Sequence, residues 1–163
     1  MKYLKLSNSS SLVKLDDEDY DRLPGYLWSL GKGNIYNSRF NLILCRFILG
    51  ITDISLQPDH IDRDIFNCQK ENLRVCTKQQ NCFNRGKGEY LKKPSSKYKG
   101  IYWMKNRKCW AVRIYVNGQR LSLKTYKSEI KAAEAYNEAV KKYYGEFGYL
   151  NKIDKKERIN KSI

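Results

Sequence analysis

The chain has 163 residues, of which 41% are hydrophobic and 30% charged, and its formal net charge is +15. This length provides one ordinary domain or two small ones, and the apolar content suffices for modest cores only. No stretch approaches the roughly 18 apolar residues of a membrane span, and the N-terminus lacks an apolar signal segment. We therefore expect an intracellular protein that is not secreted and has no membrane partner.

The positive charge is concentrated in one half of the chain. Residues 1–83 carry 11 basic and 10 acidic side chains, whereas residues 84–163 carry 21 basic and 7 acidic ones. A positive field confined to one half is typical of a polyanion-binding module joined to a second module. The alternative, a solvated surface rich in lysine, stays open at this point.

The first 50 residues predict strands and turns with little helix. The acidic run 16–19 favours a solvated turn or a helix start over a metal site, because four successive acids cannot all face one ion. A hairpin turn is expected at 31–34. The apolar run 42–49 predicts a mostly buried element that ends at Gly50.

The five cysteines form no CxxC pair, and without a secretory context reduced thiols are the default. A zinc site is a weaker alternative, because the spacings fit no common zinc pattern. Its ligands would be Cys45, Cys68, Cys76 and Cys82.

Glycine, proline, serine and charge mark 84–97 as a linker region. Alternation then predicts three strands, at 98–104, 109–116 and 119–126. Asn117-Gly118 between the last two is a strong hairpin signal. A helix follows, capped by Ser128 and ended by Gly145. Its apolar face comprises Ala132, Ala135, Tyr136, Ala139, Val140 and Tyr143. These elements predict a three-stranded antiparallel sheet packed on one helix.

The same alternation assigns the two faces of this sheet. The face toward the helix would carry Trp110, Val112, Ile114, Leu121 and Leu123. The opposite face would carry Arg113, Tyr115, Arg120, Ser122 and Lys124. Three cations beside an aromatic ring suit a DNA major groove, where Arg and Lys reach guanine edges and phosphates. A merely solvated sheet face is the alternative.

The segments most informative about chemistry are PDHID at 58–62, ENLR at 71–74 and QNCFN at 80–84. They include His60, the only histidine of the chain. The arrangement resembles the HNH nuclease motif, in which two strands and a helix surround one divalent metal. Asn67 stands where that motif has an asparagine, and Cys68 where a second often follows. The preceding region, with LVKLDDEDYDRLPGYLW and LCRFILG, resembles the N-terminal part of phage-type HNH homing endonucleases.

Phosphodiester cleavage requires a base for the nucleophile and a positive charge near the phosphate. Asp59 and Asn81 supply hard oxygens, which favour Mg²⁺ or Mn²⁺, and His60 is left to act as the general base. The resemblance implies the same roles, and it implies that Asn72 holds the loop and orients the histidine. Cys45 stands where relatives commonly have a histidine before an arginine, and Arg46 is available for a phosphate.

Residues 95–151 resemble an Apetala-type (ethylene-responsive-factor) DNA-binding domain, through SSKYKGIYW, KCWAVRI and SEIKAAEAYNEAVKKYYGEFGYLN. This resemblance adds Lys99 to the expected DNA contacts. The predicted fold class is α+β, with a ββα-metal nuclease domain ahead of the sheet and helix. The expected parts are an HNH domain at 1–88, a linker at 89–96, the DNA-binding domain at 97–151 and a basic tail at 152–163.

These features predict a metal-dependent DNA endonuclease of the homing type, whose partner is double-stranded DNA. No obligate protein partner is evident. One alternative is a non-catalytic DNA-binding protein in which the HNH half is an inactive scaffold. An RNA-binding protein is a weaker alternative, because the sheet lacks an exposed aromatic pair for stacking bases.

Overall fold

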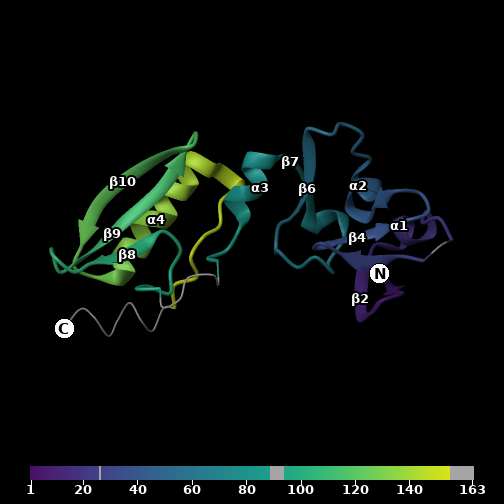
Figure 1. Cartoon of the computed structure of the whole chain (residues 1–163), viewed down its shortest axis with the longest axis horizontal. Coiled ribbons are helices and arrows are strands. Elements are labelled where there is room, and N and C mark those ends of the chain that lie inside the picture. The colour runs from purple at the N-terminus through teal and green to yellow at the C-terminus, as the bar shows by residue number, and fades with distance from the viewer. Residues whose placement is uncertain (26, 89–93, 155–163) are drawn as a thin grey trace. The chain divides into compact units, whose positions relative to one another are not determined.

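The computed structural model describes residues 1–25, 27–88 and 94–154, and it divides into two compact units, Met1–Asn84 and Arg85–Ile163 (Figure 1). The fold is mixed α/β with several small antiparallel sheets. The division lies ahead of the expected domain end at residue 88. Most of the expected linker (89–93) and of the expected tail (155–163) lies outside the described residues.

The first unit consists of short elements. They are β1 (Lys2–Leu6), β2 (Ser9–Leu15), α1 (Asp17–Asp21), β3 (Ser29–Gly31), β4 (Asn34–Asn37), β5 (Leu42–Ile43), α2 (Leu44–Leu49), β6 (Leu56–His60), the 3₁₀ helix η1 (Lys70–Asn72), β7 (Leu73–Thr77) and α3 (Lys78–Asn84). Strands pair as β1-β2, β3-β4-β5 and β6-β7. The buried core includes Val13, Leu15, Trp28, Leu44 and Ile48.

The acidic run begins a helix, as expected, but it is not simply solvated. Asp16 precedes α1 and accepts hydrogen bonds from the Gln69 side chain and the Lys70 backbone. These bonds, with that from Gln69 the stronger, lower the pKa of Asp16. Asp19 is fully buried and forms ion pairs with Arg22 and Lys70. The cluster therefore joins α1 to the segment before β7.

Two turns of the expected type connect strands. Lys32 and Gly33 join β3 to β4 with positive φ angles of 50° and 76°. Asn117 and Gly118 have 51° and 76°, which are the values of a type I′ hairpin turn. Gly50 ends α2 in the left-handed conformation at φ 64°.

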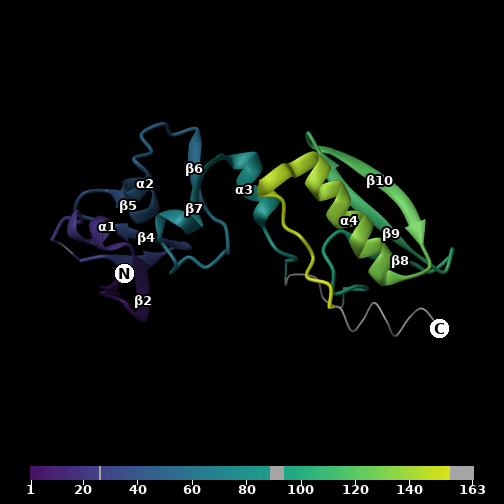
Figure 2. The same cartoon turned by 180° about the vertical axis from the view of Figure 1, so that it is seen from behind.

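The second unit contains β8 (Ile101–Met104), β9 (Cys109–Val116), β10 (Gln119–Tyr126), α4 (Glu129–Tyr144) and the 3₁₀ helix η2 (Gly145–Phe147). The sheet order is β10-β9-β8, all antiparallel. One face of this sheet is covered by α4 (Figure 2). The helix is capped by Ser128, whose Oγ accepts a hydrogen bond from the Lys131 backbone at 3.4 Å. Within the described residues, no helix is long and apolar enough to cross a bilayer.

The apolar face of α4 is rotated from the predicted one. Ala133 is buried and Tyr144 packs on the core, whereas Ala135 is only half-buried and Tyr143 is 39% exposed. The Tyr144 hydroxyl exchanges hydrogen bonds with the Tyr115 backbone, which fixes it against the sheet. The predicted and observed faces share Ala132, Tyr136, Ala139 and Val140, and packing against the sheet decides which residues beside them are buried.

Candidate functional site

The HNH-like segments form one hairpin and one helix. In the β6-β7 pair, Asp59 lies opposite Arg74 and His60 lies opposite Leu73. Helix α3 packs against both strands. Because successive side chains of a strand alternate, Asp59 and His60 point to opposite faces of this hairpin. Asp59, the expected metal ligand, and His60, the expected general base, therefore lie in different surroundings.

Asp59 lies between an arginine and an asparagine. Its Oδ2 accepts hydrogen bonds from Nε and Nη2 of Arg74 at 2.9 and 2.7 Å. Asn84 Nδ2 lies 3.0 and 3.1 Å from the two carboxylate oxygens and 2.7 Å from the His60 carbonyl oxygen. With an exposed fraction of 5%, Asp59 is a buried carboxylate whose two oxygens both accept hydrogen bonds.

Asn81, the other expected metal ligand, has different partners. Its Nδ2 donates to Gln57 Oε1 at 3.2 Å and to the Pro58 carbonyl at 3.5 Å. No hydrogen bond joins Asn81 to Asp59 in the described part of the chain. Asn84 contacts Asp59 instead. The sequence contained a signal for Asn84, because it follows Asn81 by three residues and residues three apart share a helix face.

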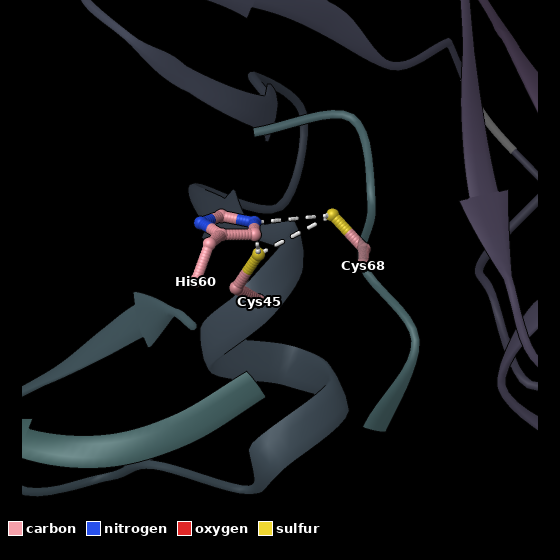
Figure 3. A group of neighbouring side chains, drawn as sticks. All are labelled: Cys45, His60 and Cys68. Atoms are coloured by element: carbon pink, nitrogen blue, oxygen red, sulfur yellow. Dashed lines mark hydrogen bonds between the residues drawn. The ribbon is translucent and has the colours of Figure 1, made fainter. Parts of the chain in front are cut away.

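His60 contacts two cysteine thiols (Figure 3). Its Nε2 lies 3.3 Å from Cys45 Sγ and 3.7 Å from Cys68 Sγ, and the two sulfurs lie 3.4 Å apart. The other ring nitrogen, Nδ1, points away from the sulfurs (Figure 3), and the hydrogen bonds of the ring to described residues are both made by Nε2. Sequence reasoning treated Cys45 and Cys68 as departures from the motif and missed that they meet at the histidine.

The thiols and the imidazole shift one another's proton affinity. Hydrogen bonding from Cys68, followed by His60, outweighs burial and lowers the pKa of Cys45 to about 6. The hydrogen bond to Cys45, together with burial, raises the pKa of Cys68. Burial would lower the pKa of His60, but the hydrogen bond and charge of Cys45 raise it. Cys45 is thus the sulfur best suited to be a thiolate.

The four-cysteine zinc site considered from the sequence is wrong. Cys76 Sγ donates to the Gln57 carbonyl at 3.3 Å, on the hairpin face that carries Asp59. Cys82 is exposed on α3. Only Cys45 and Cys68 of the four come together, because strand alternation and helix packing direct the other two elsewhere.

Asn72 forms hydrogen bonds with the loop that follows His60. Its Nδ2 donates to Asp62 Oδ1 at 2.9 Å and to the Asn67 carbonyl at 2.7 Å, and its Oδ1 accepts from the Asp62 backbone at 3.0 Å. Asn67 Nδ2 donates to Asp62 Oδ2 at 2.8 Å. Burial raises the pKa of Asp62, but the hydrogen bond from the Asp64 backbone, followed by those from the Asn67 and Asn72 side chains, outweighs burial and lowers it. The geometry is that of a residue that holds the loop.

Arg46 is largely committed to the backbone. Its guanidinium donates to the carbonyl oxygens of Leu56, Ile51 and Asp53 at 2.6, 3.2 and 2.8 Å. It therefore pins the segment between α2 and β6. Since a guanidinium has five donors, a phosphate contact through the remaining ones stays a prediction.

In the second unit, the expected polar face of the sheet carries an arginine stacked on an aromatic ring. The Arg113 guanidinium lies 4.5 Å from the centre of the Tyr102 ring, and its buried Nε has no hydrogen-bond partner among the described residues. Ser122 pairs with Arg113, and Arg120 pairs with Tyr115, which is 52% exposed. A flat cation, a phenol and a hydroxyl thus share one exposed surface.

Two other expected DNA contacts, Lys124 and Lys99, have local surroundings that the sequence did not predict. The register of β10 shifts between Ser122 and Thr125, which places Lys124 in an irregular stretch. Lys124 borders a hollow of about 380 Å³ that is also lined by α4. Lys99 directs its Nζ to the Arg85 carbonyl and over the Tyr149 ring. A β-bulge interrupts the alternation of side chains between the two sheet faces. Counting residues along the strand therefore does not predict the face on which Lys124 lies.

Comparison with known proteins agrees with this division. The family model described as HNH endonuclease matches residues 41–82, and that described as AP2 domain matches residues 96–146. The chain thus has an HNH-plus-AP2 architecture, in which an HNH endonuclease module is followed by an AP2 module.

Two proteins show this similarity over different lengths. The chain is 32% identical over 127 residues to an uncharacterised HNH endonuclease of Acanthamoeba polyphaga mimivirus, covering 78% of this chain and 62% of the viral protein. It is 40% identical over 63 residues to an AP2/ERF and B3 domain-containing transcription repressor of Arabidopsis thaliana, covering 39% of this chain and 17% of the plant protein. The chain thus spans less than two thirds of either relative. No solved structure matches it.

Proposed function

We propose that the chain is a metal-dependent DNA endonuclease of the homing type, in which a ββα-metal unit (β6, β7 and α3) hydrolyses a phosphodiester bond at a site chosen by the AP2 module. The observation that carries this proposal is the state of His60. Its Nε2 is held at the two thiols, and its Nδ1 points away from them. That histidine lies within the segment that matches the HNH endonuclease model.

A thiolate at Cys45 can only accept a hydrogen bond, so its contact with Nε2 would favour the tautomer that carries the proton at Nε2. A neutral imidazole carries one N–H and one lone pair. With the proton at Nε2 donated to Cys45, the lone pair lies at Nδ1, where it accepts a proton from the attacking water. Asn72 bonds to Asp62 in the loop after His60, and in this proposal that loop limits the movement of the ring. His60 is then a positioned general base, and Asn72 is a positioning residue.

The oxygen donors of Asp59 and Asn81 suit Mg²⁺ or Mn²⁺. The Asn81 amide directs its Nδ2 to Gln57 and Pro58, so its Oδ1 is available. Asp59 Oδ1 accepts only from Asn84 among the described residues, and a carboxylate oxygen has two acceptor positions. These two oxygens would hold the ion. When bound, a divalent ion supplies positive charge to the phosphate undergoing attack.

The AP2 module provides the affinity for DNA in this proposal. Residues 84–163 have 21 basic and 7 acidic side chains, and Arg113, Arg120 and Ser122 lie on the sheet face that α4 leaves uncovered. Double-stranded DNA carries a dense phosphate charge that attracts such a surface. Base edges in the major groove offer acceptors to arginine. Duplex DNA is therefore the proposed substrate and partner.

A specific observation favours a second candidate function, a DNA-binding protein with an inactive HNH scaffold. Arg74 already neutralises Asp59 through two hydrogen bonds to Oδ2. A divalent ion at Asp59 would have to share the carboxylate with this guanidinium. If it cannot, the hairpin is held together by the ion pair and has no catalytic metal.

Nicking of supercoiled plasmid with and without Mg²⁺ separates the two candidates. We expect nicking that requires Mg²⁺ in the wild type and is lost in Asp59→Ala. Glu71→Ala, an exposed neighbour in the same segment, serves as the control and should cut like the wild type. Mg²⁺ should also raise the melting temperature of the wild type and not that of Asp59→Ala, because a ligand stabilises the state that binds it. If the wild-type protein binds the plasmid and never nicks it, the second candidate, a DNA-binding protein with an inactive HNH scaffold, is the function that remains.

A further inference from the structure

Three soft ligand atoms converge beside the proposed catalytic histidine. Cys45 comes from α2, His60 from the end of β6 and Cys68 from the segment before η1. Their Sγ, Nε2 and Sγ atoms lie 3.3 to 3.7 Å from one another (Figure 3). Among the described residues, they are the one group of three such ligand atoms close enough to share an ion.

The spacing is close to that of one face of a tetrahedral zinc site. Zinc bonds of about 2.3 Å to sulfur and about 2.0 Å to nitrogen place two sulfurs about 3.8 Å apart and a sulfur and a nitrogen about 3.5 Å apart. The sulfurs here lie 3.4 Å apart, and the sulfur–nitrogen distances are 3.3 and 3.7 Å. Shifts of a few tenths of an ångström would accommodate the ion.

The ligands are also held in place by the fold. Cys45 and Cys68 are 5% and 0% exposed, and both belong to the core of the first unit. The Cys68 backbone donates to the Lys14 carbonyl at 2.9 Å, and the Asn67–Lys14 bridge continues this contact. His60 ends a paired strand. Ligands fixed on separate elements of a folded unit lose little freedom when the ion binds.

We propose that Cys45, His60 and Cys68 form a binding site for one Zn²⁺ ion, with the fourth position open to water or to a phosphate oxygen. Two thiolates balance the charge of the ion, and the protons of the two thiols leave to solvent on binding. Thiolate and imidazole favour Zn²⁺ over Mg²⁺, which prefers oxygen ligands. The site therefore differs from the oxygen donors of Asp59 and Asn81 in position and in chemistry.

Zinc at this site would remove the general base, a consequence that rests on the proposed endonuclease function. When the lone pair of Nε2 binds zinc, the proton of the neutral ring must lie at Nδ1. Nδ1 can then donate a proton but cannot accept one from water. The zinc-bound chain and the chain with an active His60 are mutually exclusive states, so zinc inhibits Mg²⁺-dependent cleavage.

Metal binding is tested on the reduced full chain with Co²⁺ as a spectroscopic probe and with Zn²⁺ in competition. We expect one Co²⁺ per chain, with an intense thiolate charge-transfer band in the near ultraviolet that Zn²⁺ abolishes. Cys45→Ser and Cys68→Ser should weaken binding by about 10²-fold or more, because removing a metal ligand costs more affinity than removing a group that only hydrogen-bonds to a ligand. Cys76→Ser is the matched control, since this thiol is buried yet lies outside the group.

The outcomes are distinct. Binding that survives in Cys45→Ser and Cys68→Ser, or that is lost equally in Cys76→Ser, would overturn the site. If a cysteine variant fails to fold, His60→Ala provides the same comparison, because its ring is partly exposed. In addition, Zn²⁺ should raise the melting temperature of the wild type more than that of His60→Ala. Equal shifts in the two proteins would also overturn the proposal.

Inhibition is tested separately by plasmid nicking in excess Mg²⁺. One equivalent of Zn²⁺ should lower the wild-type rate at least tenfold, and a chelator selective for Zn²⁺ over Mg²⁺ should restore it. An unchanged or faster nicking rate in protein whose Co²⁺ band shows a filled site would overturn the claim that a bound metal prevents His60 from acting as the general base. If no metal supports nicking, the endonuclease proposal fails, while the charge-transfer band still decides the zinc site.

Discussion

The two units of the chain place their proposed functional residues by different means. In the first unit, the proposed zinc ligands Cys45, His60 and Cys68 come from segments far apart in the sequence and meet at its core. In the second unit, the polar sheet residues belong to adjacent strands joined by a two-residue turn. The chemistry proposed for the first unit therefore depends on long-range packing, whereas the DNA binding proposed for the second follows from local strand pairing and charge.

The largest expected effect concerns this charge. A fragment comprising residues 85–163 has its own buried core and should bind duplex DNA alone. If it contacts six or more phosphates, its affinity should fall by about 10³-fold or more between 50 and 200 mM salt. Fluorescence anisotropy at several salt concentrations measures this slope. Residues 1–84 alone, with nearly balanced charge, should bind DNA weakly. If that fragment binds DNA as tightly as residues 85–163 do, the assignment of DNA binding to the second unit is wrong.

The next effect tests the first unit. His60→Ala should lower the rate of plasmid nicking by about 10²-fold or more, which is the usual contribution of a general base. DNA affinity should change little, because binding is assigned to the other unit. Single-turnover cleavage measured beside equilibrium binding separates the two quantities. A wild-type rate in this variant would remove His60 from the mechanism.

A smaller effect concerns the packing of the second unit. Gly100 has a φ of +76°, and an added Cβ would lie 2.1 Å from the Tyr136 ring and 2.7 Å from the Arg113 carbonyl oxygen. Gly100→Ala should therefore lower the free energy of unfolding by roughly 2–4 kcal/mol, through strain and overpacking. Gly118→Ala is the control, since it has the same φ and open space around it. It should cost about 1 kcal/mol. Denaturant unfolding of both variants measures the difference.

The smallest effect sharpens the assignment of the sheet face. If Arg113 reads a base, Arg113→Ala should cost about 1–3 kcal/mol of binding free energy and relax the sequence preference. A phosphate contact would instead weaken all sequences alike. Lys131→Ala, an exposed position on α4, should retain the preference. Binding to a randomised duplex library compares the three proteins, and an unaltered preference in Arg113→Ala would place base recognition elsewhere.

Much of the fold could be predicted because its signals are local. Asn117, Gly118 and Gly33 adopt the positive φ angles that asparagine and glycine favour, and Ser128 caps α4 through its hydroxyl. The HNH and AP2 architecture was also recognisable from the sequence, because both modules retain their characteristic residues. Short-range backbone preferences and retained motifs need no tertiary information.

Only the tertiary structure decided which side chains meet. It placed Asn84 at Asp59, tied Arg46 to three carbonyls and shifted Lys124 by a bulge. It also brought Cys45 and Cys68 to His60. Each of these contacts joins different elements or breaks a regular period, and strand alternation or helix spacing describes one element at a time. The chemistry available to His60 therefore follows from packing among α2, β6 and the loop that ends at Cys68.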